Sequence, residues 1–253
     1  MLTARHDRVF LPLLAGLIGL AWLALIVWGQ SPYGRYLSHD ALAELRLDGR
    51  GALFLVFVGG WTLMTIAMML PTSLPLITMF RRMTASQADA GRLSALLLGG
   101  YLAVWVLFGV AVHLADLGLH QIIGASATLE RHAWLIGSGT VLLAGLYQFT
   151  ALKYRCLDEC RSPLTFIASH WSGRNRQRSA FRLGVDHGIF CVGCCWSLML
   201  VMFAVGHGNL GWMFLLGAVM AAEKNLAWGR QMSAPLGYSL VGAGIALILL
   251  GLT

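Results

Sequence analysis

Seven long apolar segments, separated by polar connections, constrain this chain more than any other feature of its sequence. A helix must present roughly 20 mostly apolar residues to cross the hydrocarbon core of a bilayer. Segments that approach this length lie near 10–28, 52–70, 93–115, 134–152, 188–205, 210–228 and 236–252. Only 11% of the residues are charged, against about a quarter in an ordinary soluble domain. We therefore predict an all-α fold: a polytopic membrane helix bundle of about seven transmembrane helices, forming a single integral membrane domain over residues 1–253.

Lysine and arginine are distributed unevenly among the connections between these segments. If the N-terminus is cytoplasmic, the cytoplasmic connections hold 14 of the 18 lysines and arginines, and the external connections hold 4. This excess is the positive-inside pattern. It predicts a cytoplasmic N-terminus and an external C-terminus. The arginines clustered between Arg174 and Arg182 are interpreted as part of this pattern, with membrane lipid as their partner and no nucleic acid.

The start of the fifth apolar segment carries a concentration of side chains that bind metals. Residues four apart share one face of a helix, so His187, Cys191, Cys195 and Met199 form one stripe, with Cys194 and Met202 beside it. Imidazole, thiolate and thioether groups select soft metals such as Cu(I) over Mg²⁺ or Ca²⁺. Small residues also pack well between membrane helices, but three cysteines within five positions favour metal or redox chemistry.

A second cysteine pair, Cys156 and Cys160, follows the fourth segment. Its spacing puts both thiols on one face if the helix continues, and Pro163 then ends that helix. The predicted topology places this pair on the same cytoplasmic side as Cys191. Because the cytosol is reducing, standing disulfides are not expected there. We therefore interpret the five cysteines as reduced thiols that face a metal.

Other residues are expected at the same membrane level. Glu223 and Lys224 end the sixth segment, and ionisable residues within a span usually face the bundle interior or water. Glu223 would be a ligand or a proton acceptor, or else would pair with Lys224 at the interface. Met68, on the second segment, is either an ordinary core methionine or a thioether ligand suited to copper. The secondary candidates are therefore Glu223, Lys224, Met68, Met199 and Met202.

The chain resembles a bacterial family of predicted metal-binding integral membrane proteins, a family of unknown function. The resemblance covers about residues 50–235. The segments that carry it are Trp61–Pro71, Gly145–Gln148 with Lys153, Cys156 and Cys160, His187–Met199 with its C-x-G-C-C-W motif, and Glu223–Lys224. It implies metal binding and a multi-pass protein of the bacterial inner membrane. The chain departs from the family pattern after Lys224, where the next proline is Pro235.

Three functions are consistent with these patterns. The favoured one is a non-enzymatic protein that handles a soft transition metal, with copper preferred and zinc or iron as alternatives. Its site is predicted from Cys156, Cys160, His187, Cys191, Cys194 and Cys195. It would transport the metal, or exchange it with a metal-donor or metal-acceptor protein. The alternatives are a membrane thiol-redox protein that moves electrons through cysteine pairs, and an assembly protein whose cysteines only pack.

Overall fold

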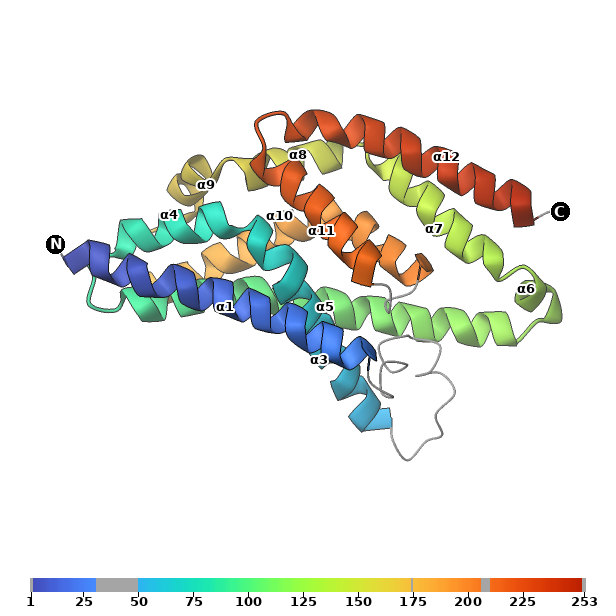
Figure 1. Ribbon diagram of the computed structural model, residues 1–253, viewed down its shortest axis with the longest axis horizontal. Coiled ribbons are helices and arrows are strands. Elements are labelled where there is room, and N and C mark those ends of the chain that lie inside the picture. The colour runs from blue at the N-terminus through green and yellow to red at the C-terminus, as the bar shows by residue number, and fades with distance from the viewer. Residues whose placement is uncertain (1, 31–49, 174, 206–209, 252–253) are drawn as a thin grey trace.

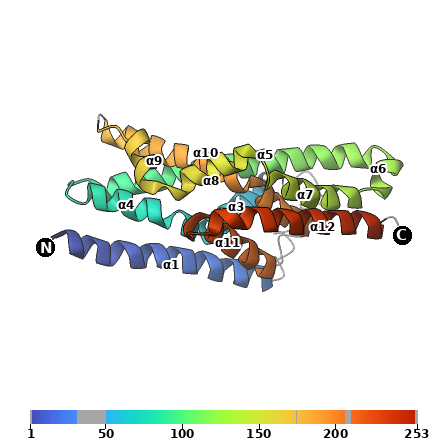
Figure 2. The ribbon, with the colours of Figure 1, turned by 90° about the horizontal axis from the view of Figure 1, so that it is seen from above.

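The computed structural model describes residues 2–30, 50–173, 175–205 and 210–251, and the elements in these ranges are all helices (Figure 1). The long helices are α1 (Leu2–Gln30), α3 (Arg50–Thr72), α5 (Ala90–Gly124), α10 (Arg176–Val205) and α12 (Ser233–Gly251). The shorter elements are α4 (Leu74–Thr84), α6 (Ala127–Arg131), α7 (Trp134–Tyr147), α8 (Ala151–Arg161), α9 (Pro163–His170), α11 (Leu210–Asn225) and the 3-10 helix η3 (Gly229–Met232). The predicted all-α class is confirmed. Viewed from above, α1, α5, α10 and α12 run along the long axis of the molecule (Figure 2).

Five helical stretches in the described part of the chain are long and apolar enough to cross a membrane. They are Phe10–Gln30, Phe54–Thr72, Ala90–Gly124, Arg176–Met202 and Gly229–Gly251. A sixth span is obtained if α7 and α8, which are bent by 66° at their junction, count as one. The structure therefore supports a membrane protein with five to six candidate spans, fewer than the seven predicted.

The two differences from the predicted spans have local causes. The predicted segment 134–152 is interrupted at Gln148–Thr150, where the Thr150 side chain accepts a hydrogen bond from the Lys153 amide at 3.3 Å and starts α8 as a new helix. The predicted segment 210–228 ends earlier, at Asn225, which leaves α11 with 16 residues. At 1.5 Å per residue α11 is about 24 Å long, short of the roughly 30 Å hydrocarbon core.

The centre of the bundle is the close contact between α5 and α10. A Cβ atom at Gly184 of α10 would collide with the Leu97 carbonyl of α5, and one at Gly100 of α5 would collide with the Phe181 carbonyl of α10. Glycine at both positions therefore lets the two backbones touch, as is common between membrane helices. This contact fixes the position of α10, and with it the position of the cysteines that α10 carries.

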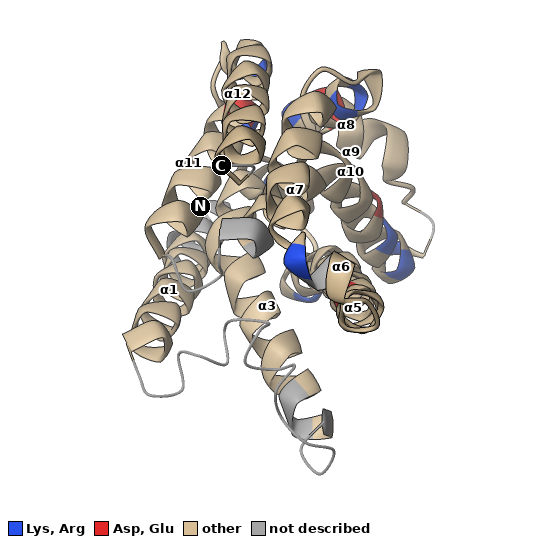
Figure 3. Cartoon of the chain, turned by 90° about the vertical axis from the view of Figure 1, so that its right-hand side faces the viewer, with Lys and Arg blue, Asp and Glu red and all other residues tan. Residues whose placement is uncertain are grey.

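The outer surface of the bundle is apolar along the helix sides. Leu13, Leu55, Leu107 and Leu250 are each more than 60% exposed and point away from the core. In Figure 3 charged residues are restricted to a few turns, such as those of α6, α8 and the start of α10. A surface of this kind is suited to lipid, because lipid chains solvate leucine as well as a protein core does.

Candidate functional site

Four cysteines from two helices converge in the interior of the bundle. Cys191, Cys194 and Cys195 lie on the buried face of α10, and each is at most 1% exposed. Cys160 reaches them from α8, with its sulfur 4.0 Å from that of Cys194. The Cys194 and Cys195 thiols donate to the Cys191 carbonyl, three and four residues earlier on the same helix, at 3.1 and 2.8 Å. We refer to these four residues as the cysteine cluster.

Lys224 of α11 brings a positive charge into the cysteine cluster. Its side-chain nitrogen is 2.9 Å from the Cys191 sulfur and 3.9 Å from the Cys195 sulfur. It also donates to the Thr72 hydroxyl of α3 at 3.2 Å, and the residue is 5% exposed. An ammonium has three hydrogens to donate and cannot accept. The Lys224 ammonium therefore donates toward the sulfurs of two cysteines.

Tyr101 and Met69 complete the surroundings of Cys191 and Cys195. The Tyr101 hydroxyl, on α5, is 3.1 Å from the Cys191 sulfur and donates to the Met69 carbonyl at 3.2 Å. The Met69 sulfur, on α3, is 3.7 Å from the Cys195 sulfur. Neither residue was predicted for the site, because a lone Tyr or Met inside an apolar segment looks like ordinary core. A thioether is thus in place beside a thiol.

His187 lies one helical turn from Cys191 but faces another neighbour. Its Nε2 atom is 3.0 Å from the Ser73 hydroxyl, and its ring stacks on Tyr101 with centroids 5.5 Å apart. Its Nδ1 atom is buried and has no hydrogen-bond partner among the described residues. A buried imidazole nitrogen without a partner is uncommon. His187 is therefore close to the cysteine cluster and keeps one nitrogen available.

Cys156 packs differently from the other four cysteines. It lies against the backbone of α10 at Gly193, where an added Cβ would come within 2.6 Å of its sulfur. Cys160, one turn further along α8, is the residue that meets the cluster. All five cysteines are free thiols. The predicted pair is thus divided, with Cys160 in the cluster and Cys156 beside it.

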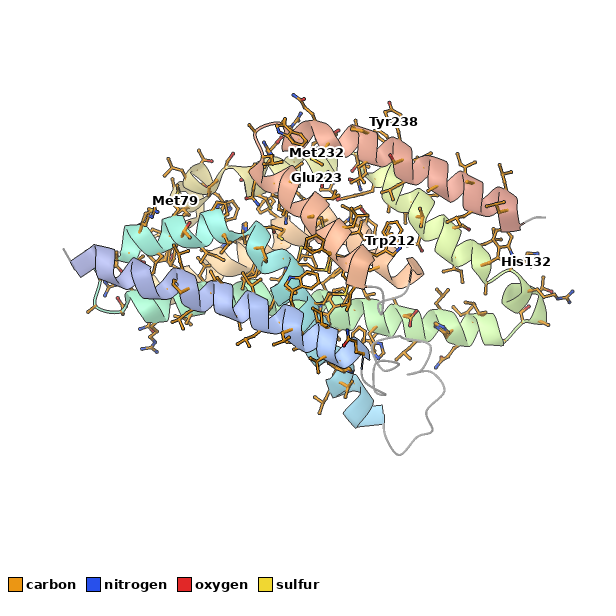
Figure 4. All side chains as sticks on the ribbon, viewed as in Figure 1. Met79, His132, Trp212, Glu223, Met232 and Tyr238 are labelled. Carbon is orange, nitrogen blue, oxygen red and sulfur yellow. The ribbon has the colours of Figure 1, made fainter. Side chains whose placement is uncertain are left out.

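Glu223 forms a separate buried ion pair next to the cysteine cluster. Both of its carboxylate oxygens are 2.9 Å from the Lys153 ammonium of α8, and the Ser233 hydroxyl donates to one of them at 2.7 Å. Lys153 also donates to the Gln148 side chain, and Arg161 donates to the Glu223 carbonyl. Glu223 is labelled near the end of α11 in Figure 4. In this arrangement the carboxylate is held by Lys153 and Ser233, away from the sulfurs.

The three predicted methionines are all buried. Met68, Met199 and Met202 are each at most 2% exposed. Met199 and Met202 follow Cys195 along α10, and Met68 lies against Gly217 of α11. None of them contacts the Cys191 sulfur within the described contacts. They extend the sulfur-rich interior beyond the cysteine cluster.

The donor set of this site suits a soft monovalent metal better than a hard one. Four thiols and the Met69 thioether meet here, with the His187 imidazole one turn away along α10, and such ligands select Cu(I). Among the described residues, no three His, Cys, Asp or Glu side chains stand in a ready metal-binding arrangement. The position of Lys224 is consistent with the lack of a ready metal-binding arrangement, since its ammonium lies within 3.9 Å of the sulfurs of both Cys191 and Cys195. Metal binding would require the lysine to withdraw and the thiols to turn inward.

A known family matches most of the chain. The model of the family described as PpoB2, copper chaperone, matches residues 58–247. That range contains all five cysteines, Lys153, Glu223 and Lys224. No curated protein and no solved structure matches the chain.

Proposed function

The chain belongs to the PpoB2 family of copper chaperones, and we propose that it holds Cu(I) within the membrane on the cysteine cluster and passes it on. Family membership supports copper as the metal, and also supports interaction with metal-handling partners. The observation that carries the specific site is the convergence of Cys160, Cys191, Cys194 and Cys195 around Lys224. A chaperone must bind its metal firmly and still release it: the sulfur ligands would provide the binding, and the competing Lys224 ammonium would favour the release.

The binding step follows from the contacts of Cys191 and Cys195. Cu(I) binds thiolates, so it would take the place of the Lys224 ammonium at these two sulfurs, and any thiol that enters the metal's coordination would lose its proton. Met69 and Cys194 are near enough to contribute a third sulfur. His187, whose Nδ1 has no hydrogen-bond partner among the described residues, is a candidate nitrogen donor one turn along α10. No change in the oxidation state of copper is needed.

The orientation of the protein in the membrane is part of this proposal. The positive-inside pattern supports a cytoplasmic N-terminus, a site that is reached from the cytoplasmic side, and a location in the bacterial inner membrane. It also supports a crossing by the short helix α11, which would make seven spans. Copper would then come from a cytoplasmic donor and leave to an acceptor protein or across the membrane.

The proposal is tested by the double variant Cys191→Ser, Cys195→Ser. Protein purified in detergent under reducing conditions and loaded with Cu(I) should contain stoichiometric copper, and the double variant should lose it. Copper is measured by elemental analysis. Cys156→Ser is the matched control, because Cys156 lies against Gly193 and outside the cluster, and it should keep its copper. Equal copper in the wild type and the double variant would refute the proposal.

One contact favours the thiol-redox alternative. The Cys160 and Cys194 sulfurs are 4.0 Å apart, so a small movement would bring them within bonding distance of about 2.05 Å. In that function these two thiols would form a disulfide and give up two electrons and two protons to an external oxidant. Thiol labelling after mild oxidation separates the two functions: a redox protein loses two labels, at Cys160 and Cys194, and regains them on reduction.

A further inference from the structure

Methionines continue from the cysteine cluster along three neighbouring helices. On α10 the stripe Cys191, Cys195 is followed by Met199 and Met202, and on α11 the stripe that ends at Lys224 contains Met213, Gly217 and Met220. On α3 the site residues Thr72 and Met69 are preceded by Met68 and Met64. All these methionines are at most 4% exposed. We define Met64, Met68, Met69, Met199, Met202, Met213 and Met220 as the methionine track.

Contacts at two points along this track bring the helices together. Cys195 of α10 meets Met69 of α3, and Lys224 of α11 meets both Cys191 of α10 and Thr72 of α3. Further along, Met68 of α3 lies against Gly217 of α11, at a distance where even an added Cβ would make ordinary contact. The cluster end of the track is therefore bounded by all three helices, and its middle is bounded by α3 and α11.

The track leads away from the cysteine cluster in one direction. α10 is antiparallel to α3 and α11 (Figure 1). The direction toward the C-terminus of α10 is therefore the direction toward the N-termini of α3 and α11. At 1.5 Å per residue, Met199 and Met220 lie about 6 Å beyond Cys195 and Lys224, and Met202 and Met213 about 10 and 16 Å beyond them. The sulfurs are thus spaced by about one helical turn over more than half of a bilayer core.

A buried hydroxyl on the same path lacks a partner. Thr65 shares the α3 face of Met69 and Thr72 and lies one turn beyond Met69. The residue is 1% exposed, and its Oγ1 atom has no hydrogen-bond partner among the described residues. Buried polar atoms are usually satisfied. An unpartnered hydroxyl on this face is therefore an independent sign that the path accepts a polar or charged guest.

We propose that the methionine track conducts Cu(I) between the cysteine cluster and the opposite membrane face. This inference rests on the proposed function, because it takes the cluster as the copper site. Thioethers are neutral, soft ligands that bind Cu(I) but carry no charge to hold it. Cu(I) would move from thiolate to thioether by ligand exchange, with its single charge and its oxidation state unchanged. As copper leaves, the Lys224 ammonium returns to the cluster and balances the thiolate charge left behind.

The experiment uses Met→Leu variants, because methionine also fills cores for packing alone. Leucine keeps the volume of methionine and usually costs less than about 1.5 kcal/mol. The track variant is Met199→Leu, Met202→Leu, Met220→Leu. The matched control is Met79→Leu, Met83→Leu, Met232→Leu, three methionines on α4 and η3 that lie away from the track; Met79 and Met232 are labelled in Figure 4. The single variant Met220→Leu serves if the triple variant does not fold.

Each protein is reconstituted in lipid vesicles that contain a membrane-impermeant Cu(I) chelator, bathocuproine disulfonate. Cu(I) with ascorbate is added outside, and the colour of the trapped complex gives the rate of entry. We expect the wild type and the control variant to exceed empty vesicles, and the track variant to be slower by about tenfold, with a smaller reduction for Met220→Leu. Copper bound in detergent should be equal in all of them.

The outcomes separate this proposal from the proposed function. If the wild type binds copper but transfers none above empty vesicles, or if the track variant transfers as fast as the control, the track is refuted and the chaperone function stands. If the track variant loses bound copper while Met220→Leu transfers at the wild-type rate, the methionines are structural and the track is again refuted. If the wild type binds no copper, both proposals fail.

Discussion

Lys224 places its ammonium at the cysteine sulfurs, and a metal ion would have to displace it in order to bind there. Its ammonium is 2.9 Å from the Cys191 sulfur in a region closed to water. At such distances in a protein interior, charges interact much more strongly than in water. Lys224 would therefore act on copper exchange, as a competitor when the metal arrives and as a replacement when it leaves.

Replacing this ammonium should slow copper release. In Lys224→Met no cation re-enters the cluster as copper departs, so the departing state keeps uncompensated thiolates and is less stable. We expect the rate of copper transfer to a soluble Cu(I) chelator to fall by about tenfold, which is a barrier rise of about 1.4 kcal/mol. Lys224→Arg, which keeps the charge, is the control. Release from Lys224→Met at or above the wild-type rate would contradict this role.

At the scale of the helices, the close contact of α5 with α10 positions the cysteines. A side chain at Gly184 would meet the Leu97 carbonyl, which is backbone and cannot turn aside. We expect Gly184→Ala to push the helices apart and to destabilise the protein by about 1–3 kcal/mol. The measurement is thermal unfolding in detergent, together with copper binding.

Gly99→Ala is the matched control for this substitution. Gly99 lies on α5, but an added Cβ there meets no atom within 4 Å. Alanine is favoured over glycine inside a helix by up to about 1 kcal/mol, so this variant should be neutral or more stable. If both variants unfolded at the same temperature, the close α5–α10 contact would not contribute to the stability of the protein.

The helices themselves were largely predictable from the sequence, and their ends and partners were not. Long apolar runs locate α1, α3, α5, α10 and α12, because a span must be continuous in hydropathy. The break before α8 depends on a single Thr150 cap, and a cap is a weak signal inside an apolar run. The spacing of cysteines on α10 predicted a shared face for Cys191 and Cys195, since that is a property of one helix.

Contacts between helices set the rest of the site, and one sequence does not encode them in a readable pattern. Lys224 and Glu223 are neighbours in the chain, but they point to different helices, one to Cys191 and one to Lys153. Tyr101 reaches Cys191 across 90 positions. The predicted group of six ligands therefore separates into the cysteine cluster, with His187 and Cys156 beside it.

At the scale of the whole molecule, the number of crossings determines where the C-terminus lies. α11 has 16 residues, so whether it crosses decides between six and seven spans. With seven, the two ends of the chain are on opposite sides; with six, they are on the same side. The distribution of lysine and arginine favours seven.

Reporter fusions at the two ends test this topology. A reporter that is active only in the cytoplasm should be active at the N-terminus and inactive after Thr253. The control is an insertion at Gly173, between α9 and α10, which should behave like the N-terminus because an even number of predicted spans separates them. Activity at both ends would establish an even number of spans and would place α11 as a helix that enters without crossing.

The buried pair of Lys153 and Glu223 has a consequence for how the protein is made. Lys153 is synthesised 70 residues before its partner, and a buried charge without a partner is unfavourable. During synthesis α8 would therefore stay near the membrane surface until α11 arrives with Glu223. The last two α-helices, α11 and α12, thus complete the bundle, and a truncated product would present an unpaired cation by which the cell's quality-control machinery could recognise it.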